Sequence, residues 1–143
     1  MAKKTGDQWV QNGARLKAWF VMRRDLMTSG KLAVQIGHGT DYIHMWGGAN
    51  PHYADWLNAS VGNRRKIVLG AKSEDELNKL AQDCVAKGMF CTLIVDAGLT
   101  EFGGVATITG LVVHPHPDSD IPKSLKRAQA WKDIWLTKTE LVA

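Results

Sequence analysis

Three short apolar runs, separated by segments long enough for helices, constrain the fold most strongly. The strands that these runs predict occupy residues 18–22, 65–70 and 90–95 of the 143-residue chain, the second of them beginning with the charged Arg65 and Lys66. Each run is too short for a buried helix and is rich in β-branched or aromatic residues, which is typical of a buried strand. Because helical patterns separate the runs, we expect crossover connections and a largely parallel sheet with helices packed against it.

The segment between the second and third runs is the best-specified helix of the chain. Ser73 and Glu76 form a capping box, in which a serine hydroxyl and a glutamate three residues later satisfy free N–H groups of the first turn. An apolar stripe follows at helical spacing. Gly88 then supplies the left-handed conformation that commonly ends a helix.

A second helix is expected from about Gly30 until Gly47-Gly48. Its apolar stripe has helical spacing and consists of Leu32, Ile36, Gly39 and Ile43. The same spacing one residue earlier gives a polar row made of Lys31, Gln35 and His38. At about 100° per residue this row lies beside the buried face of the helix.

A fourth strand is expected over residues 107–113, and Pro115 and Pro117 are expected to end it. Only residues 96–106 separate it from the third run, which favours an antiparallel direction because no helix fits into that link. The sequence therefore predicts an α/β fold, a three-layer α/β/α arrangement with a mixed four-stranded sheet. Residues 1–17 are expected to be a polar arm, and residues 18–143 a single domain with a C-terminal helical tail.

Positive charge is concentrated near the start of the chain. The formal net charge is +4, and residues 1–31 hold seven Lys or Arg against two Asp. Two further basic clusters lie at residues 64–66 and 123–127. Local basic patches attract phosphates even where the total charge is modest, although a solvated, solubilising surface explains such charges equally well.

Several classes of protein are disfavoured by composition. The charged fraction of 22% argues against a highly charged disordered chain. No uncharged apolar stretch approaches the ~18–20 residues of a membrane span, and the first residues do not resemble a signal peptide. Cys84 and Cys91 fit neither a disulfide framework nor a common metal-binding spacing, so we expect buried free thiols and a location in the cytosol.

Two charged residues fall where an α/β sheet usually binds its ligand, at the carboxyl ends of the strands. Lys31 follows Gly30 in a first helical turn, where free N–H groups already favour an anion. Asp96 directly follows the third run. A solvated lysine and a loop-capping aspartate are the ordinary alternatives. In a functional site, Asp96 would orient Lys31 or His38, or would position a water molecule.

The motifs of several enzyme classes are missing from the sequence. It contains no G-x-S-x-G, no G-x-x-x-x-G-K-[ST] and no G-x-G-x-x-G. This argues against covalent serine hydrolysis, nucleoside triphosphate hydrolysis and dinucleotide-dependent redox chemistry. The histidines lack helical ligand spacing, so we expect no metal and no cofactor.

Three ordered motifs carry a resemblance to a known family. They are Asp25-Leu26-x-x-x-Gly30-Lys31-x-Ala33-x-Gln35-x-x-His38, then Asp96-Ala97-Gly98-Leu99-Thr100, then Thr107-Ile108-Thr109-Gly110-Leu111 followed by Pro115. Over about residues 18–128 the chain resembles the type 2 peptidyl-tRNA hydrolases, the archaeal and eukaryotic kind. The resemblance implies a mixed four-stranded sheet with flanking helices. It also implies an esterase that separates a stalled peptide from its tRNA, with peptidyl-tRNA as partner.

The resemblance also implies roles for individual residues. Its catalytic residues would be Lys31, Gln35, Asp96 and Thr100. Its substrate-binding residues would be Gly30, His38, Gly98, Thr107 and Thr109. We expect direct attack of water on the ester carbonyl: Asp96 would position or partly deprotonate the water, Lys31 would stabilise the oxyanion or the leaving oxygen, and Gln35 would fix the geometry.

Departures from the family pattern leave alternatives open. Ile36-Gly37 replaces the usual Cys-Ala, Val105-Ala106 replaces Pro-Gly, and Ile108 replaces a frequent Arg. They motivate a second hypothesis, an inactive member of the fold that acts as an RNA-binding or regulatory protein. A third is a hydrolase of a smaller ester or amide. The six tryptophans are also unusual, and a Trp-rich surface would suit a homodimer.

Overall fold

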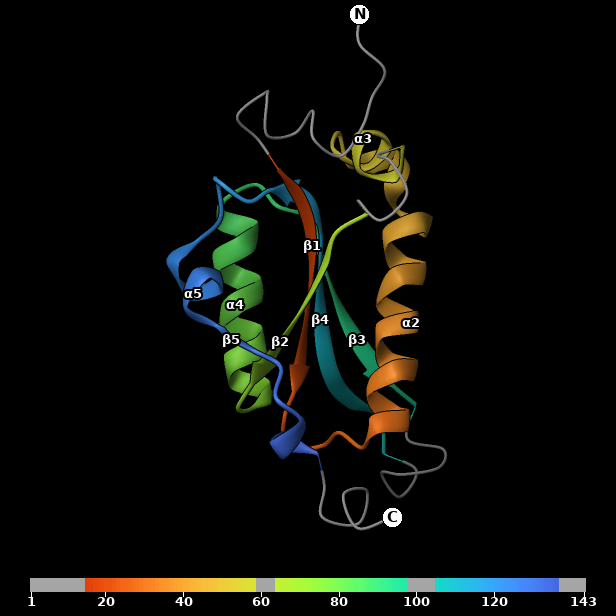
Figure 1. The fold of residues 1–143 in the computed structure, drawn as a ribbon, viewed down its shortest axis with the longest axis vertical. Helices are drawn as coiled ribbons and strands as arrows, with labels where there is room; N and C mark the ends of the chain where they lie inside the picture. The colour runs from red at the N-terminus through yellow and green to blue at the C-terminus, as the bar shows by residue number, and fades with distance from the viewer. Residues whose placement is uncertain (1–14, 59–63, 98–104, 137–143) are drawn as a thin grey trace, which may run out of the picture.

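A mixed sheet forms the centre of the computed structural model, which describes residues 15–58, 64–97 and 105–136 (Figure 1). The strand order is β3-β4-β1-β2-β5. The strands are β1 (Leu16–Arg23), β2 (Lys66–Ala71), β3 (Cys91–Asp96), β4 (Thr107–Pro117) and β5 (Gln129–Ala130). β1 and β2 are parallel, whereas β4 is antiparallel to both β1 and β3. The mixed sheet is confirmed, and the two-residue β5 is a strand that the sequence analysis did not include.

Helices cover both faces of the sheet, which confirms the three-layer arrangement (Figure 1). One face is covered by α2 (Ser29–Met45) and the short α3 (Tyr53–Leu57), and the opposite face by α4 (Glu74–Ala86) and α5 (Lys123–Arg127). Two single turns of 3-10 helix, η1 (Gly47–Ala49) and η2 (Asp133–Trp135), complete the described elements. None of these helices combines the length and the apolarity needed to cross a membrane.

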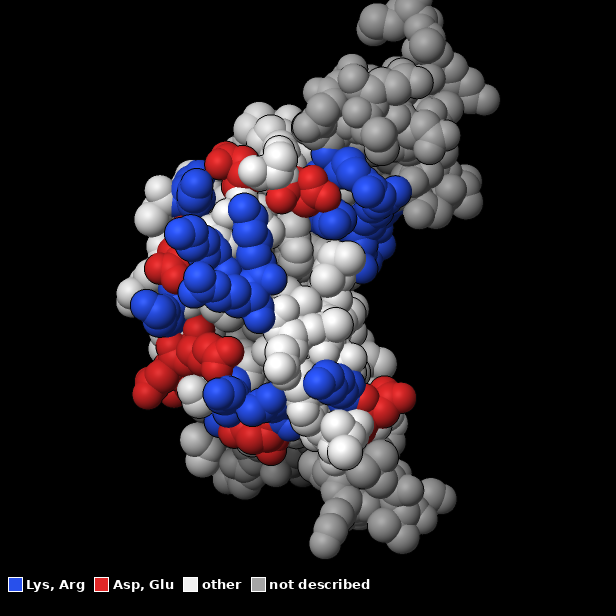
Figure 2. All heavy atoms as spheres, turned by 60° about the vertical axis from the view of Figure 1, so that its left-hand side comes forward, with Lys and Arg blue, Asp and Glu red and all other residues white. Residues whose placement is uncertain are grey.

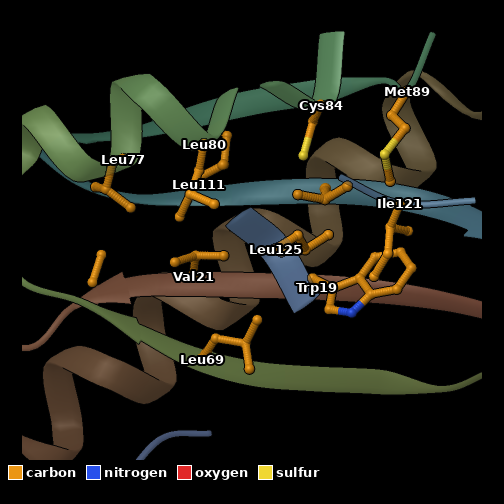
Figure 3. Packing of buried hydrophobic residues seen from close by; sticks show 12 residues of the cluster. Trp19, Val21, Leu69, Leu77, Leu80, Cys84, Met89, Leu111, Ile121 and Leu125 are labelled. Atoms are coloured by element: carbon orange, nitrogen blue, oxygen red, sulfur yellow. The ribbon is translucent and has the colours of Figure 1, made fainter. Parts of the chain in front are cut away.

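The central strand β1 contributes to two hydrophobic cores. Trp19 and Val21 point toward α4 and pack with Leu77 and Leu80 (Figure 3). Phe20 and the neighbouring even-numbered positions of β1 pack on the opposite face beneath α2 and α3. A strand that is buried on both faces has no polar alternation, which explains why residues 18–22 form an uninterrupted apolar run.

The two ends of α4 follow the sequence signals. The Ser73 hydroxyl accepts a hydrogen bond from Glu76 N at 3.2 Å. The Glu76 carboxylate reaches Lys72 N at 3.1 Å, one residue before the Ser73 amide that a standard capping box would satisfy. Gly88 has a φ of 77°, the left-handed conformation expected of it. The helix is therefore confirmed.

β4 continues beyond Val113 and Pro115, where the fourth strand was expected to stop, and ends at Pro117, the second of the two prolines expected to end it. The register against β1 shifts between Lys17 and Trp19, which pair with His116 and Val113. Two residues of β4 therefore lie opposite one residue of β1, as in a β-bulge. Pro115 falls at this irregularity, where its missing N–H removes no regular bond of the ladder.

The two cysteines lie side by side between α4 and β3. Both are free thiols, as expected, with Cys84 buried and Cys91 half-buried. A hydrogen bond with Cys84, together with burial, raises the pKa of the Cys91 thiol above its ordinary value. On the neighbouring strand, burial lowers the pKa of His114 to about 4. His114 Nε2 lies 2.9 Å from the Thr92 hydroxyl, so this neutral imidazole is part of the sheet's internal hydrogen bonding.

Two glycines of α2 allow a matched test of how closely this helix approaches the sheet. A Cβ on Gly39 would lie 2.8 Å from Cε1 of the fully buried Phe20, whereas a Cβ on Gly37 would meet nothing within 4 Å. Alanine at either position gains about 1 kcal/mol of helix propensity. We expect Gly39→Ala to be less stable than Gly37→Ala by about 1–3 kcal/mol, the usual cost of overpacking. Urea unfolding of both variants measures this difference, and equal midpoints would contradict close packing at Gly39.

Candidate active site

The first turn of α2 places a lysine inside the molecule. The Thr28 hydroxyl caps the helix by accepting a hydrogen bond from Lys31 N at 3.2 Å. Lys31 and Gln35, one turn apart, are both buried, and Gln35 is fully inaccessible. The expected arrangement is altered here, because Lys31 and Gln35 of the polar row lie on the buried face itself. Leu32 and Ile36 are only half-buried, and His38 is exposed. Lys31 and Gln35 can be buried because they form hydrogen bonds with polar partners inside the molecule.

The carboxylate of Asp96, at the end of β3, is the shared partner of both side chains. Lys31 Nζ lies 2.6 Å from Asp96 Oδ2, and Gln35 Nε2 donates to the same oxygen at 3.0 Å. The side chains of Lys31 and Asp96 are only 7% and 13% exposed. Charge-assisted hydrogen bonds of this kind are short and strong. The structure thus brings together an ammonium and a carboxylate from residues 65 positions apart.

Thr109 fixes the orientation of Gln35 from the neighbouring strand β4. Its hydroxyl donates to Gln35 Oε1 at 2.8 Å and lies 3.3 Å from the carbonyl oxygen of Ile94. An ionised carboxylate only accepts hydrogen bonds, so the amide nitrogen must face Asp96 and the amide oxygen must face the threonine. The result is a directed series of donors from Thr109 through Gln35 to Asp96.

Replacing Thr109 by valine tests this series. The substitution keeps the shape of the side chain and removes the hydroxyl from the buried Gln35 oxygen, so we expect a loss of about 1–3 kcal/mol in stability. Thr107→Val is the matched control, because the half-exposed Thr107 donates only to the local Val105 carbonyl oxygen at 3.0 Å. We expect the control to change stability by less than about 0.5 kcal/mol. Urea unfolding compares the two, and equal losses would contradict the buried series.

The other residues singled out from the sequence are arranged differently. Gly30 and His38 are exposed on α2, and no contact within the described ranges joins His38 to Lys31, Gln35 or Asp96. Thr107 pairs with Asp96 across the β3–β4 ladder. Gly98 and Thr100 lie outside the described residues.

Sequence reasoning missed Arg23, the last residue of β1. Its guanidinium donates to both carboxylate oxygens of Asp25, at 3.2 and 2.8 Å, and to the carbonyl oxygen of Ile108 at 3.2 Å. Arg23 therefore ties the β1–α2 connection to β4, the strand that carries Thr107 and Thr109. An arginine at a strand end, two residues before Asp25, the first acid of the motif, is the signal that could have identified it.

Electrostatics favour an anion at this end of the sheet. The N-terminus of α2 carries the positive end of its helix dipole, and the Lys31 ammonium adds a full positive charge there. Asp96 balances this charge in the resting site and also provides an oxygen that can accept a proton or hold a water molecule. Within residues 15–58, 64–97 and 105–136, no group of three or more His, Cys, Asp and Glu side chains is placed to hold a metal ion. An ammonium beside a carboxylate, at the N-terminal end of a helix, suits hydrolysis by an activated water.

Comparison with known proteins identifies the family. Residues 16–130 match the model of the family described as peptidyl-tRNA hydrolase PTH2. The chain is 35% identical over 112 residues to the peptidyl-tRNA hydrolase of Thermococcus sibiricus, which covers 76% of this chain and 92% of that protein. It is 32% identical over 109 residues to that of Methanococcus vannielii, covering 74% and 90%. Because the match extends from the start of β1 to the end of β5, the chain belongs to the peptidyl-tRNA hydrolase family PTH2, as the three motifs predicted.

Proposed function

We propose that this chain hydrolyses the ester bond of peptidyl-tRNA through its Lys31–Gln35–Asp96 site, releasing peptide and free tRNA. The observation that carries the proposal is the buried contact of 2.6 Å between Lys31 Nζ and Asp96 Oδ2 in a chain of this family. Burying an ammonium and a carboxylate costs desolvation free energy that their attraction does not always repay, so the burial of this pair supports a role beyond stability.

The proposed reaction is a direct attack of water on the ester carbonyl. A carboxylate offers about four acceptor positions, so Asp96 can hold a water molecule in addition to the Lys31 and Gln35 donors. The water oxygen forms a bond to the carbonyl carbon as Asp96 takes its proton. The bond to the ribose oxygen then breaks, and that oxygen receives the proton. Lys31 stabilises the negative charge that develops on the oxygens.

The remaining site residues divide into two roles under this proposal. Thr109 is fully buried, so it positions Gln35 and does not touch the substrate. Gly30, in the first turn of α2, and His38, in its third turn, are exposed and available to the substrate. Thr107, on β4, pairs with Asp96. We assign Gly98 and Thr100, which directly follow Asp96, to contacts with the water and the ester.

The tRNA is proposed to lie along the basic surface. Lys and Arg side chains gather on the face that carries α4 and α5 (Figure 2). Contacts of such side chains with the RNA backbone give affinity that depends on salt and little on sequence. Because peptidyl-tRNA arises from ribosomes, we infer that the protein acts in the cytoplasm.

Release of an N-acetylated amino acid from tRNA tests the proposed activity. The purified chain should hydrolyse N-acetyl-aminoacyl-tRNA at a rate well above the spontaneous rate. Folded protein that binds tRNA without hydrolysing the ester would contradict the proposal and favour the inactive alternative. No observation supports that alternative at present, because Lys31, Gln35 and Asp96 are all present and in contact.

A homodimer is the second partner that we propose. Met45, Trp46 and Phe90 are 66%, 55% and 39% exposed. Trp46 and Phe90 line a hollow of about 450 Å³ at the edge strand β3. Large exposed apolar side chains around one hollow support a contact with a second copy. Light scattering of the parent protein should give a molecular mass twice that of one chain, and the Trp46→Ser variant should give the mass of one chain. A parent protein with the mass of one chain would contradict the dimer.

A further inference from the structure

A hollow lined by three cations lies beside β2, apart from the Lys31–Asp96 site. It has a volume of about 230 Å³, and Arg24, Lys72 and Arg127 contribute its positive charges. Glu76 is the single carboxylate in its lining, and that side chain accepts a hydrogen bond from Lys72 N. Within the described part of the chain, no carboxylate forms an ion pair with any of the three cations. The hollow therefore has an excess of positive charge.

The hollow opens at the same end of the sheet as the proposed active site, the end at which the parallel strands finish. Arg24 directly follows β1, and Gly70 in the hollow lies at the carboxyl end of β2, which is parallel to β1. β3, which ends in Asp96, also runs in the direction of β1, because both strands are antiparallel to β4. The carboxyl ends of β1, β2 and β3 therefore lie at one end of the sheet, where the β1–α2 connection also lies (Figure 1).

A C-terminal segment, residues 131–136, holds Arg24 in place. Trp131 N donates to the carbonyl oxygen of Val68 at 2.9 Å, which anchors the segment to β2. The Trp135 ring covers Gly70 so closely that a Cβ at Gly70 would overlap it. The Arg24 guanidinium lies 4.9 Å from the centre of the Trp135 ring, a cation–π contact that orients the side chain without neutralising it. This segment begins just beyond the family match, which ends at residue 130.

We propose that this hollow binds a backbone phosphate of the RNA substrate whose ester the Lys31–Asp96 site cleaves. Arginine presents several N–H donors in a fork that matches phosphate oxygens. Two arginines and a lysine line this hollow, and none of them forms an ion pair with a carboxylate of the described residues. Lys72 and Arg127 are exposed, so the hollow is open to a long chain as well as to a small anion. Lys123 and Lys126 continue the positive charge along α5, which favours a polyanion. The inference rests on the proposed function, since it takes tRNA as the substrate.

Salt-dependent binding of deacylated tRNA tests the proposal. Each phosphate contact adds about one unit to the slope of log affinity against log salt concentration. We expect Arg24→Gln and Arg127→Gln each to reduce this slope by about one unit. Lys79→Gln is the matched control, because it removes the same charge from an exposed position on α4 outside the hollow. Because Lys79 lies on the same basic face but outside the hollow, we expect Lys79→Gln to reduce the slope by clearly less than either arginine variant does.

Trp135 has a positioning role that a second pair of variants tests. Trp135→Leu should reduce the slope as Arg24→Gln does, and Trp135→Phe should restore most of it, since a phenyl ring still stacks against a guanidinium. If Trp135→Leu unfolds the protein, the two arginine variants still decide the question. A purely structural role for Trp135 would change stability and leave the slope as in the parent.

The outcomes separate this inference from the proposed activity. Deacylated tRNA has no ester, so its binding does not depend on hydrolysis. Slopes for Arg24→Gln and Arg127→Gln equal to that of Lys79→Gln would overturn the inference even in an active enzyme. Free inorganic phosphate is the other possible source of the anion. Calorimetry measures its binding to the parent protein and to Arg24→Gln. Arg24-dependent phosphate binding with unchanged tRNA slopes would also overturn the inference, because the hollow would then serve a free anion.

Discussion

Replacing Lys31 by alanine is expected to lower kcat for peptidyl-tRNA hydrolysis by about 10²–10³-fold, the usual effect of losing one donor to a developing oxyanion. The ammonium is nearly buried, and it lies 2.6 Å from the carboxylate that we assign to the attacking water. Charges act more strongly in such a site than in bulk water. Because the interaction strengthens in the transition state, kcat and kcat/KM should fall together.

Single-turnover hydrolysis of N-acetyl-aminoacyl-tRNA measures this effect. Lys79→Ala is the control, because it removes an exposed lysine that lies outside the site. Lys31→Arg should remain strongly impaired, since a larger planar guanidinium does not fit where a compact ammonium lies 2.6 Å from Asp96. A folded Lys31→Ala variant with kcat within tenfold of the parent would remove Lys31 from the mechanism. An increase in KM alone would assign it to substrate binding instead.

The parts of the fold that were predicted from sequence are those that local signals specify. The helix that became α4 has a cap at Ser73, an apolar stripe and a stop at Gly88, all within one segment. The run at residues 18–22 is apolar throughout because β1 is the central strand of a sheet covered on both faces. In both cases the cause of the structure is present within a few residues of chain.

Features that depend on distant contacts were not predictable in this way. β4 extends through Pro115 because a bulge against β1 removes the need for its N–H, and β5 exists only because residues 129–130 return to pair with β2. Periodicity placed Lys31 and Gln35 beside the buried face of the helix. Their burial depends on Asp96 and Thr109, which lie more than 60 residues away in the sequence.

The tryptophans show the same division between local and distant causes. Trp19 and Trp56 are buried in the two cores, while Trp46 is exposed next to the hollow at β3. Trp131 and Trp135 meet edge to face, with ring centres 5.4 Å apart, over the end of β2. Nothing in the local sequence around them specifies that strand as their partner. The family motifs named Lys31, Gln35 and Asp96 as candidates from the sequence. Only the three-dimensional contacts show which group donates and which accepts in each hydrogen bond.

Replacing Asp96 by asparagine is expected to abolish most turnover and also to destabilise the fold. Asparagine keeps the size of the side chain but cannot accept a proton from water, so general-base assistance worth about 10²–10⁴-fold is lost. The Lys31 ammonium remains nearly buried without the charge of its carboxylate partner. Breaking a buried pair from one side costs about 3–5 kcal/mol, and the hydrogen bonds that asparagine still accepts place this variant near the lower limit.

The double variant Lys31→Met/Asp96→Asn separates the chemical role of the pair from its structural one. With both charges removed, the cost of an unpaired buried ion disappears, so the double variant should be more stable than Asp96→Asn alone and close to the parent. Its turnover should nonetheless remain as low as that of the single variants, because water activation and oxyanion stabilisation are both missing. Urea unfolding and single-turnover kinetics on the parent protein, Lys31→Met, Asp96→Asn and the double variant supply the cycle. If the double variant is as unstable as Asp96→Asn, the cost arises from the Gln35–Thr109 hydrogen bonds and not from the unpaired ammonium. If its stability returns while activity does not, the charges are there for the reaction, since the fold does not require them.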